Sequence, residues 1–307
     1  MPKSRLSGDG RKTRRSTVKP ELQSADMGDA KAHPGPVHRF IGLSLGGGKT
    51  DKACLAVLEY YPKHKKVFLS RLVEKIKTEG DVSGDALIVN EVRSFENVVS
   101  VAFDVPYRLP QCLNCIPGCD GMENCPSEHI QWMWKHAEKH LKPKRPKKLF
   151  TPYTQRCVEL YVNHELEEKF AMQHAMGSNV APLLARAMYL KNKLQLPTLE
   201  VYPKLSVWRV GRSLDVMKSH LRFHKHSIGG DASRKEILQA LNEHNVAFVY
   251  NEDIKLMIEN NHAFEAFICA LTGFLEYQGV TEPRPKGFPK AEDWISFPLQ
   301  NLKWNFF

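Results

Sequence analysis

The sequence predicts an α/β fold in which helices flank a mixed β-sheet. The first observation is a set of three strand-like apolar runs, at residues 40–45, 53–61 and 66–76. The second is the run 98–103, which is almost continuously apolar and ends at Asp104, as expected of a buried central strand. Strands that come first and are followed by alternating helices and strands indicate a mixed sheet covered by helices.

The elements follow one another in a regular order. A glycine turn joins the first two strands, and Pro-Lys-His-Lys-Lys joins the second to the third. A helix is predicted at 83–95 with Ser83 as its N-cap, and short strands are predicted at 198–203 and 246–250. Further helices are predicted at 127–141, 155–174, 180–194, 232–244 and 253–277. In the last of these, apolar residues recur every three or four positions.

The predicted organisation is one domain with a basic arm. Residues 1–38 are rich in Lys, Arg, Ser, Gly and Pro without periodicity, which predicts a disordered basic arm. The domain is expected to span 39–301 and to contain a cysteine-rich and basic insertion at 111–150. Residues 302–307 are expected to form a C-terminal tail.

Positive charge favours a nucleic-acid partner without requiring one. The net charge is +10, and neutralising phosphates releases condensed counterions. However, residues 1–39 hold nine Lys and Arg against four Asp and Glu. Solvated tails that keep the chain soluble would explain the same excess.

Membrane and export signals are missing from the sequence. No apolar stretch approaches the roughly 20 residues that a membrane helix needs, and the basic start lacks an apolar core and a cleavage site. We therefore expect a soluble, cytoplasmic protein with no membrane partner. The sequence gives no indication of the oligomeric state.

The glycine-rich segment 46–50, Gly-Gly-Gly-Lys-Thr, has two interpretations. A phosphate-binding loop would make the chain a nucleotide hydrolase, but the residue five positions before Gly48 is Leu43, where that motif requires glycine. The motif must also open a helix that faces the phosphates. The other interpretation is a hairpin turn, because consecutive glycines suit backbone with positive φ.

Five local patterns resemble one known family. They are GLSLGGGKTDKACLAVL, VAFDVPYRLP, LEVYP, NHAFEAFICALTGFLEYQG and AEDWISFP, in that order between residues 40 and 298. Together they resemble domain-of-unknown-function family 429 (DUF429), predicted nucleases of the ribonuclease H-like class. The pattern His262-x-x-Glu265-Ala266 also resembles the H-x-x-D-A element of RuvC-type junction resolvases. The resemblance implies a ribonuclease H-like sheet and metal-dependent hydrolysis of nucleic-acid phosphodiester bonds.

The resemblance also implies the site residues. Asp104, Glu200 and Glu265 match the family's acidic positions, and His262 lies one turn before Glu265. Such acids would hold Mg²⁺ or Mn²⁺, since hard divalent cations prefer carboxylate oxygens. Arg156 matches a basic position of the family and is expected to meet a phosphate.

One position departs from the family pattern. Ser44 stands in the first strand, where the family carries an aspartate that bridges both metal ions. Asp51 would substitute if it paired with Ser44 across the hairpin, whereas pairing of Ser44 with residue 52 would turn Asp51 to the other face. A nucleic-acid-binding pseudonuclease that does not cut is therefore the alternative function.

A cysteine cluster is the most specific local signal. Cys112, Cys115, Cys119 and Cys125 have C-x2-C-x3-C-x5-C spacing. Thiolates in such spacing bind structural Zn²⁺ or an iron–sulfur cluster, and disulfides or free thiols are the remaining alternatives. The basic run that follows, with Lys144, Arg145 and Lys147, is a candidate nucleic-acid contact; a plain linker is the other interpretation.

Overall fold

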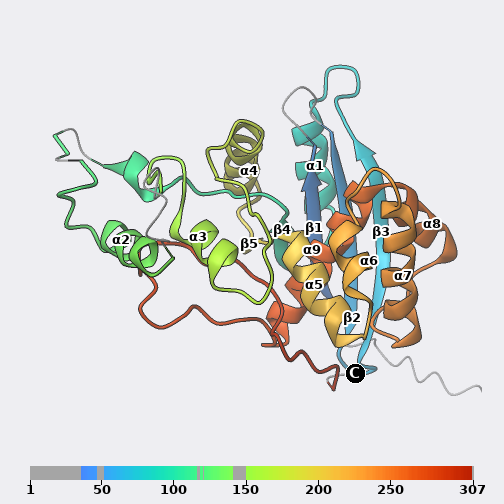
Figure 1. Ribbon diagram of the computed structural model, residues 1–307. Helices are drawn as coiled ribbons and strands as arrows, with labels where there is room; N and C mark the ends of the chain where they lie inside the picture. Colours follow the sequence, from blue (N-terminus) through green and yellow to red (C-terminus); the bar gives the residue numbers. More distant parts are fainter. Residues whose placement is uncertain (1–35, 47–51, 116–117, 120, 141–149, 306–307) are drawn as a thin grey trace, which may run out of the picture. The chain divides into compact units, whose positions relative to one another are not determined.

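A five-stranded mixed sheet is the central layer of the structure (Figure 1). Its strands are β1 (His38–Leu45), β2 (Ala53–Tyr61), β3 (Lys66–Ile76), β4 (Val98–Phe103) and β5 (Thr198–Glu200). The strand order is β3-β2-β1-β4-β5; β1, β2 and β3 pair antiparallel, whereas β4 pairs parallel with β1 and β5. The predicted mixed α/β fold is confirmed, and so are the strands predicted at the positions of β1 to β5.

The computed structural model describes residues 36–46, 52–115, 118–119, 121–140 and 150–305. The chain divides into two units, 1–34 and 35–307, and everything below concerns the second. The predicted arm therefore lies almost entirely outside the described residues. Within the described residues, no helix is long and apolar enough to cross a membrane. The first residues of the expected C-terminal tail pack against the domain. Leu302 is 6% exposed, and Trp304 Nε1 donates to Ser213 Oγ at 3.0 Å.

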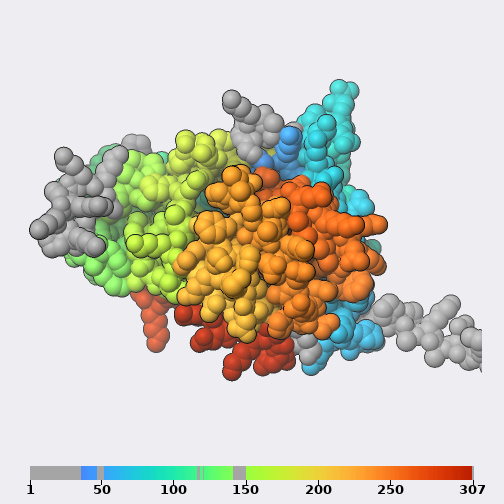
Figure 2. All heavy atoms as spheres, turned by 45° about the vertical axis from the view of Figure 1, so that its right-hand side comes forward, coloured from blue at the N-terminus to red at the C-terminus, as the bar shows by residue number. Residues whose placement is uncertain are grey.

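Helices cover both faces of the sheet. They are α1 (Gly84–Arg93), α2 (Glu128–His140), α3 (Cys157–His164), α4 (Ala181–Leu194), α5 (Pro203–Ser213), α6 (Lys218–Phe223), α7 (Gly230–Glu243), α8 (Asn251–Glu259) and α9 (Asn261–Tyr277). A short 3₁₀ turn, η1, covers Gln111–Asn114. Figure 2 shows the surface formed by residues of α5 to α8, in yellow and orange.

The two faces follow from the alternation of side chains along β1. Ile41, Leu43 and Leu45 point to the face where α1 and α4 pack. Phe40 belongs to the core on the opposite face, which is covered by α9 and by helices that pack on it. By the same alternation Gly42 and Ser44 lie on the α9 face, which determines what α9 can bring to them.

Several sequence predictions need correction. The helix predicted at 155–174 ends at His164. The helix predicted at 253–277 is broken at Asn260, whose side chain accepts hydrogen bonds from the backbone N–H groups of His262 and Ala263 and so begins α9. Residues 246–250 form only one bridge, between Phe248 and Phe68, in place of a strand. Helices α5 and α6 were not predicted.

Gly42 allows α9 to lie directly against β1. A Cβ atom added at Gly42 would collide with the backbone carbonyl of Ala266 and the backbone nitrogen of Ala270. Both obstacles are main-chain atoms of a buried helix, so neither can move aside as a side chain would. The absence of a side chain at residue 42 therefore sets how close α9 comes to the sheet.

We expect Gly42→Ala to lower the free energy of unfolding by about 3 kcal/mol, because the added methyl group overpacks a backbone contact. Urea unfolding at equilibrium measures this change. Gly80→Ala is the control: a Cβ there meets nothing within 4 Å, and only the positive φ of 56° opposes it, which costs about 1 kcal/mol. Equal losses in the two variants would contradict the close-approach argument.

Candidate functional site

Ser44 and Asp104 meet where two parallel strands end. Phe103 at the end of β4 is in register with Leu43 of β1, which puts Asp104 beside Ser44. The Asp104 carboxylate accepts hydrogen bonds from Ser44 Oγ at 2.6 Å and from the backbone N–H of Leu45 at 3.0 Å. Ser44 is completely buried. The sheet register alone therefore fixes one carboxylate at this edge.

Helix α9 brings two further groups to the same place. His262 Nδ1 lies 2.8 Å from Ser44 Oγ, and Glu265, one turn later, is 2% exposed. Asp104, His262 and Glu265 each present a ligand atom, and the three atoms lie within 4.8 Å of one another. Of the four residues predicted for the catalytic site, these three lie together; the fourth, Glu200, is described below.

The hydrogen bonds around Ser44 define which nitrogen of His262 is available. Ser44 has one hydroxyl proton, and when Asp104 is ionised the hydroxyl donates this proton to the carboxylate. The contact with Nδ1 then requires His262 to be the donor, so the lone pair lies on Nε2. Desolvation lowers the pKa of His262 below its ordinary value, which favours this neutral ring.

Two acids share the site with one cationic side chain. Burial, and then the nearby Glu265 carboxylate, raise the pKa of Asp104 to about 7. Both oxygens of Glu265 accept from Lys225 Nζ, at 2.9 and 3.1 Å, and one accepts from Asn261 Nδ2 at 3.0 Å. The Lys225 side chain is 60% exposed, so its ammonium group can leave without disrupting the core.

This donor set fits a divalent cation. Two carboxylates and a neutral imidazole nitrogen are ligands suited to Mn²⁺, and the carboxylates suit Mg²⁺. Asn261 Oδ1 is an additional buried oxygen next to Glu265 that has no hydrogen-bond partner among the described residues. Burial is the largest cause of the raised pKa of Asp104, and the second is the nearby Glu265 carboxylate, since the two carboxylates lack sufficient counter-charge. A cation held between Asp104 and Glu265 would supply it.

The site opens into a cleft of mixed character. Asp104, His262 and Lys225 line one part of it, together with Lys204. Apolar groups, including Phe170, line another part. Two lysines beside a carboxylate pair give the cleft groups that can bind an anion next to a cation site.

Glu200 and Arg156 are engaged with each other. Arg156 donates to both oxygens of Glu200, at 2.8 and 2.6 Å, and its Nε donates to Glu159 at 2.8 Å. Arg156 is 2% exposed and Glu200 is 3% exposed. Glu200 lines the cleft but does not belong to the group of converging ligand atoms. In the structure the two residues form a buried ion pair with each other; their metal and phosphate contacts stay predictions.

The hairpin register excludes both pairings considered for Asp51. Ser44 pairs with Cys54 and Leu45 with Ala53, so neither residue 51 nor residue 52 is opposite Ser44. Asp51 itself lies outside the described residues. The strands on either side of the glycine segment pair antiparallel, as the hairpin interpretation predicts, and β2 stands where a phosphate-binding loop would open a helix; residues 47–51 themselves lie outside the described residues.

The cysteine cluster is described only in part. None of the four cysteines forms a disulfide, and Cys112 Sγ lies 3.5 Å from His129 Nε2. Burial, and then the neighbouring thiols, raise the pKa of Cys112 to about 11. No three thiol sulfurs gather within 4.8 Å in the part of the chain that the structure describes. Lys144, Arg145 and Lys147 lie outside the described residues.

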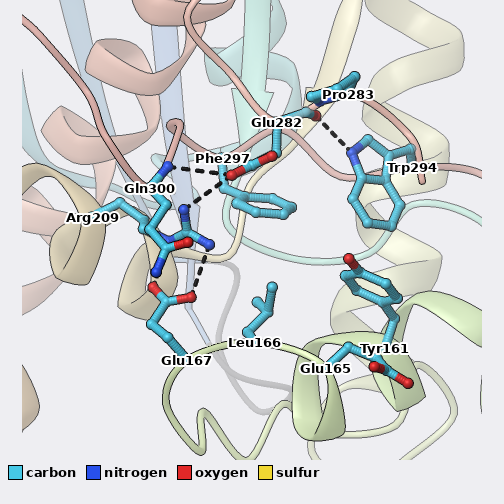
Figure 3. A pocket seen from close by; sticks show the side chains of 10 residues that line it. All are labelled: Tyr161, Glu165, Leu166, Glu167, Arg209, Glu282, Pro283, Trp294, Phe297 and Gln300. Atoms are coloured by element: carbon cyan, nitrogen blue, oxygen red, sulfur yellow. Dashed lines mark hydrogen bonds and ion pairs between the residues drawn. The ribbon is translucent and has the colours of Figure 1, made fainter.

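A second pocket, drawn in Figure 3, does not contain the predicted residues. Arg209 lies there between Glu282, at 3.1 Å, and Glu167, at 2.9 Å. Both carboxylates engage the Arg209 guanidinium, so this cation is already paired and does not offer the pocket a free positive charge for an anion. Aromatic side chains, Tyr161 and Trp294 among them, line its other side (Figure 3).

Sequence reasoning missed two members of the site, Lys225 and Asn261. Lys225 belongs to the segment between α6 and α7, where no recognisable motif marks it. Asn261 was hidden inside a helix predicted as continuous. A polar Asn-Asn-His at residues 260–262, in an otherwise apolar helix pattern, was the available signal for the break.

A family model described as "Protein of unknown function (DUF429)" matches residues 70–288. No curated protein and no solved structure matches the chain.

The raised pKa of Asp104 predicts how stability depends on pH. The folded state binds more protons than the unfolded state between the ordinary value of 3.8 and about 7, so the free energy of unfolding falls as pH rises through this window. Asp104→Asn should make that fall smaller. Chemical denaturation at several pH values measures it.

Glu292→Gln is the matched control, because burial also raises the pKa of Glu292 to about 7. Both variants should reduce the pH dependence. Mn²⁺ at about 100 times its dissociation constant should stabilise the wild type and Glu292→Gln by about 2.7 kcal/mol at pH 7, and should not stabilise Asp104→Asn. Equal stabilisation of Asp104→Asn would remove Asp104 from the cation site.

Proposed function

Because the chain belongs to the DUF429 family, whose description names no activity, we propose a function from the site itself: metal-dependent hydrolysis of phosphodiester bonds in nucleic acid. The observation that carries the proposal is the convergence of Asp104, His262 and Glu265 from a strand end and a late helix. The strand order and directions support the finer assignment to the ribonuclease H-like class, in which acids converge at this edge of the sheet.

The side chains of the site would divide the work among them. Asp104 and Glu265 would hold a Mn²⁺ or Mg²⁺ ion, with His262 Nε2 as a third donor. When bound, such an ion stabilises charge on the phosphate and activates water. Lys225 would release Glu265 to the ion, and with Lys204 it would bind phosphate oxygens in the cleft.

Ser44 makes the site different from one with a full set of acids. It stands at the position from which an aspartate would bridge two ions, and a serine hydroxyl is a poor ligand for a hard cation. Ser44 instead holds Asp104 and orients His262. The residues present therefore favour one cation over a pair, and slower chemistry.

Ser44 also favours a second candidate function. With one acid fewer, and with Lys225 bound to Glu265, the same cleft would suit a protein that binds nucleic acid without cutting it. The structural zinc proposed for the cysteine cluster is compatible with either function, as are a nucleic-acid contact by the basic run 142–148 and a cytoplasmic location.

Hydrolysis and binding without cleavage predict different effects when a metal-binding side chain is removed. We expect Asp104→Asn and Glu265→Gln to reduce Mn²⁺-dependent cleavage by at least about 100-fold, because the metal contributes several kcal/mol to transition-state stabilisation. Labelled single-stranded, duplex, hybrid and four-way-junction DNA and RNA are the substrates to assay, with binding measured in parallel. Glu259→Gln, an exposed carboxylate of the neighbouring helix α8, is the control and should cleave normally.

Far-UV circular dichroism and thermal unfolding would show whether the variants fold. If the wild type binds one of these substrates but cuts none with Mn²⁺ or Mg²⁺, the hydrolase proposal is wrong and the binding function replaces it.

Restoring the acid provides an independent test. We expect Ser44→Asp to lower the melting temperature without metal, because a new buried carboxylate would face Asp104. Saturating Mn²⁺ should reverse this loss, and Mn²⁺ affinity should rise about tenfold, equivalent to about 1.4 kcal/mol. Isothermal titration measures the affinity, and Ser44→Asn is the uncharged control. Unchanged or weaker Mn²⁺ binding in Ser44→Asp would show that the ion does not lie near residue 44.

A further inference from the structure

We propose that His136, His140 and Glu165 form a second metal site, for Zn²⁺ or a similar borderline divalent ion, that joins α2 to the end of α3. This inference is independent of the proposed hydrolysis and of the cysteine cluster. Among the described residues, this group and the Asp104 group are the two sets of three or more ligand atoms lying within 4.8 Å of one another.

Helix α2 supplies two imidazoles at the spacing a metal requires. His136 and His140 are four residues apart and therefore lie on the same helix face. Their ring centroids are 4.5 Å apart. The side chain of His136 is 4% exposed and that of His140 is 27% exposed, so the pair is buried on one side and reachable from solvent on the other.

Glu165 meets both imidazoles through one oxygen. Its Oε1 lies 2.7 Å from His140 Nε2 and 3.4 Å from His136 Nδ1. Lys139 Nζ lies 2.7 Å from Oε2 and 2.9 Å from Oε1. An ion on Oε1 would displace the second of these contacts, and Lys139 would keep its shorter hydrogen bond to Oε2, as outer hydrogen bonds commonly hold ligating carboxylates.

Neighbouring rings hold His136 in this orientation. Its other nitrogen, Nε2, lies 3.0 Å from His164 Nδ1, and the indole of Trp132 stacks on it at 4.8 Å with an interplanar angle of 16°. With Nδ1 directed to the ion, Nε2–H donates to His164. A metal-bound histidine usually donates a hydrogen bond from its second ring nitrogen to a neighbouring group.

The distances suit a tetrahedral ion. Ligand bonds of about 2.0–2.2 Å put neighbouring donor atoms about 3.3–3.5 Å apart. The His136–Glu165 separation of 3.4 Å already matches, and the His140–Glu165 separation of 2.7 Å must open by about 0.6 Å. Two imidazoles and one carboxylate favour Zn²⁺ over Mg²⁺ or Ca²⁺. Water would complete the coordination.

The position of the site would let a bound ion join two helices. Glu165 is the C-cap of α3 and also lines the pocket of Figure 3, where it lies across from Arg209. Residues 141–149, between the two helices, lie outside the described part of the chain. An ion would fasten helix α2, part of the cysteine-rich insertion, to helix α3 at this point.

Metal content of the untagged full chain tests the proposal. In a background with Cys112, Cys115, Cys119 and Cys125 changed to serine, we expect one tightly bound Zn²⁺ per chain after dialysis, measured by mass spectrometry. His140→Gln or Glu165→Gln in that background should weaken Zn²⁺ binding by at least about 100-fold, beyond the 10- to 100-fold loss of an outer-shell change. His64→Gln, an exposed histidine in the β2–β3 turn, should keep the ion.

Cobalt substitution identifies the ligands. The Co²⁺ form of the four-serine background should show visible d–d bands without the near-ultraviolet charge-transfer band of thiolates, and His140→Gln should abolish those bands. Should the serine background fail to fold, the same His140→Gln comparison in the wild type should lose one of the bound ions while keeping the thiolate band. No ion lost with His140→Gln, or an equal loss with His64→Gln, would overturn the proposal.

Discussion

The close contact between α9 and β1 is the constraint on which the site depends. Gly42 is the β1 residue that faces the backbone of α9, and any side chain there would collide with it. Ser44 is the next residue on the same face of β1, and His262 and Glu265 lie at the start of α9. Because both elements are buried on each side, the spacing that Gly42 sets is transmitted to the 2.8 Å contact between Ser44 and His262. Packing in the core thus determines polar geometry at the edge.

The site itself is balanced between two ways of neutralising buried acids. Asp104 and Glu265 face each other, and the ammonium group of Lys225 neutralises only one of them. A divalent cation would neutralise both, and Lys225 is exposed enough to give way. When the cation replaces it, the ammonium group of Lys225 would leave Glu265 and could bind a phosphate in the cleft. With serine in place of aspartate at residue 44, the site has one negative charge fewer. Replacement of the Lys225 ammonium group by a divalent cation is therefore less favourable than it would be with an aspartate there.

The sequence predicted the strands of the sheet because apolar runs reveal them directly, whereas the grouping of Asp104, His262 and Glu265 was expected only from the family resemblance, which also included Glu200. It could not predict the hairpin register, since the sequence does not show at which residues β1 ends and β2 begins. The structure pairs Ser44 with Cys54. Lys225 depends on how α6 and α7 pack, which no local pattern records. The break at Asn260 was hidden because the apolar period continues across it. Glu200 matched a motif, yet a motif gives no information about Arg156, 44 residues earlier in the chain.

The ion pair between Glu200 and Arg156 connects the sheet to helix α3. Arg156 directly precedes α3 and joins Glu200, at the end of β5, to Glu159 within that helix. At its other end α3 reaches Glu165, which contacts His136 and His140 of α2. Charged contacts at its two ends therefore join α3 to the edge of the sheet and to the helix of the insertion. Because removing one partner of a buried ion pair leaves an uncompensated charge, loss of the Glu200 carboxylate would disturb the start of α3 as well as the cleft that Glu200 lines. An acid in a family motif can thus be required for the architecture around a site without belonging to the site.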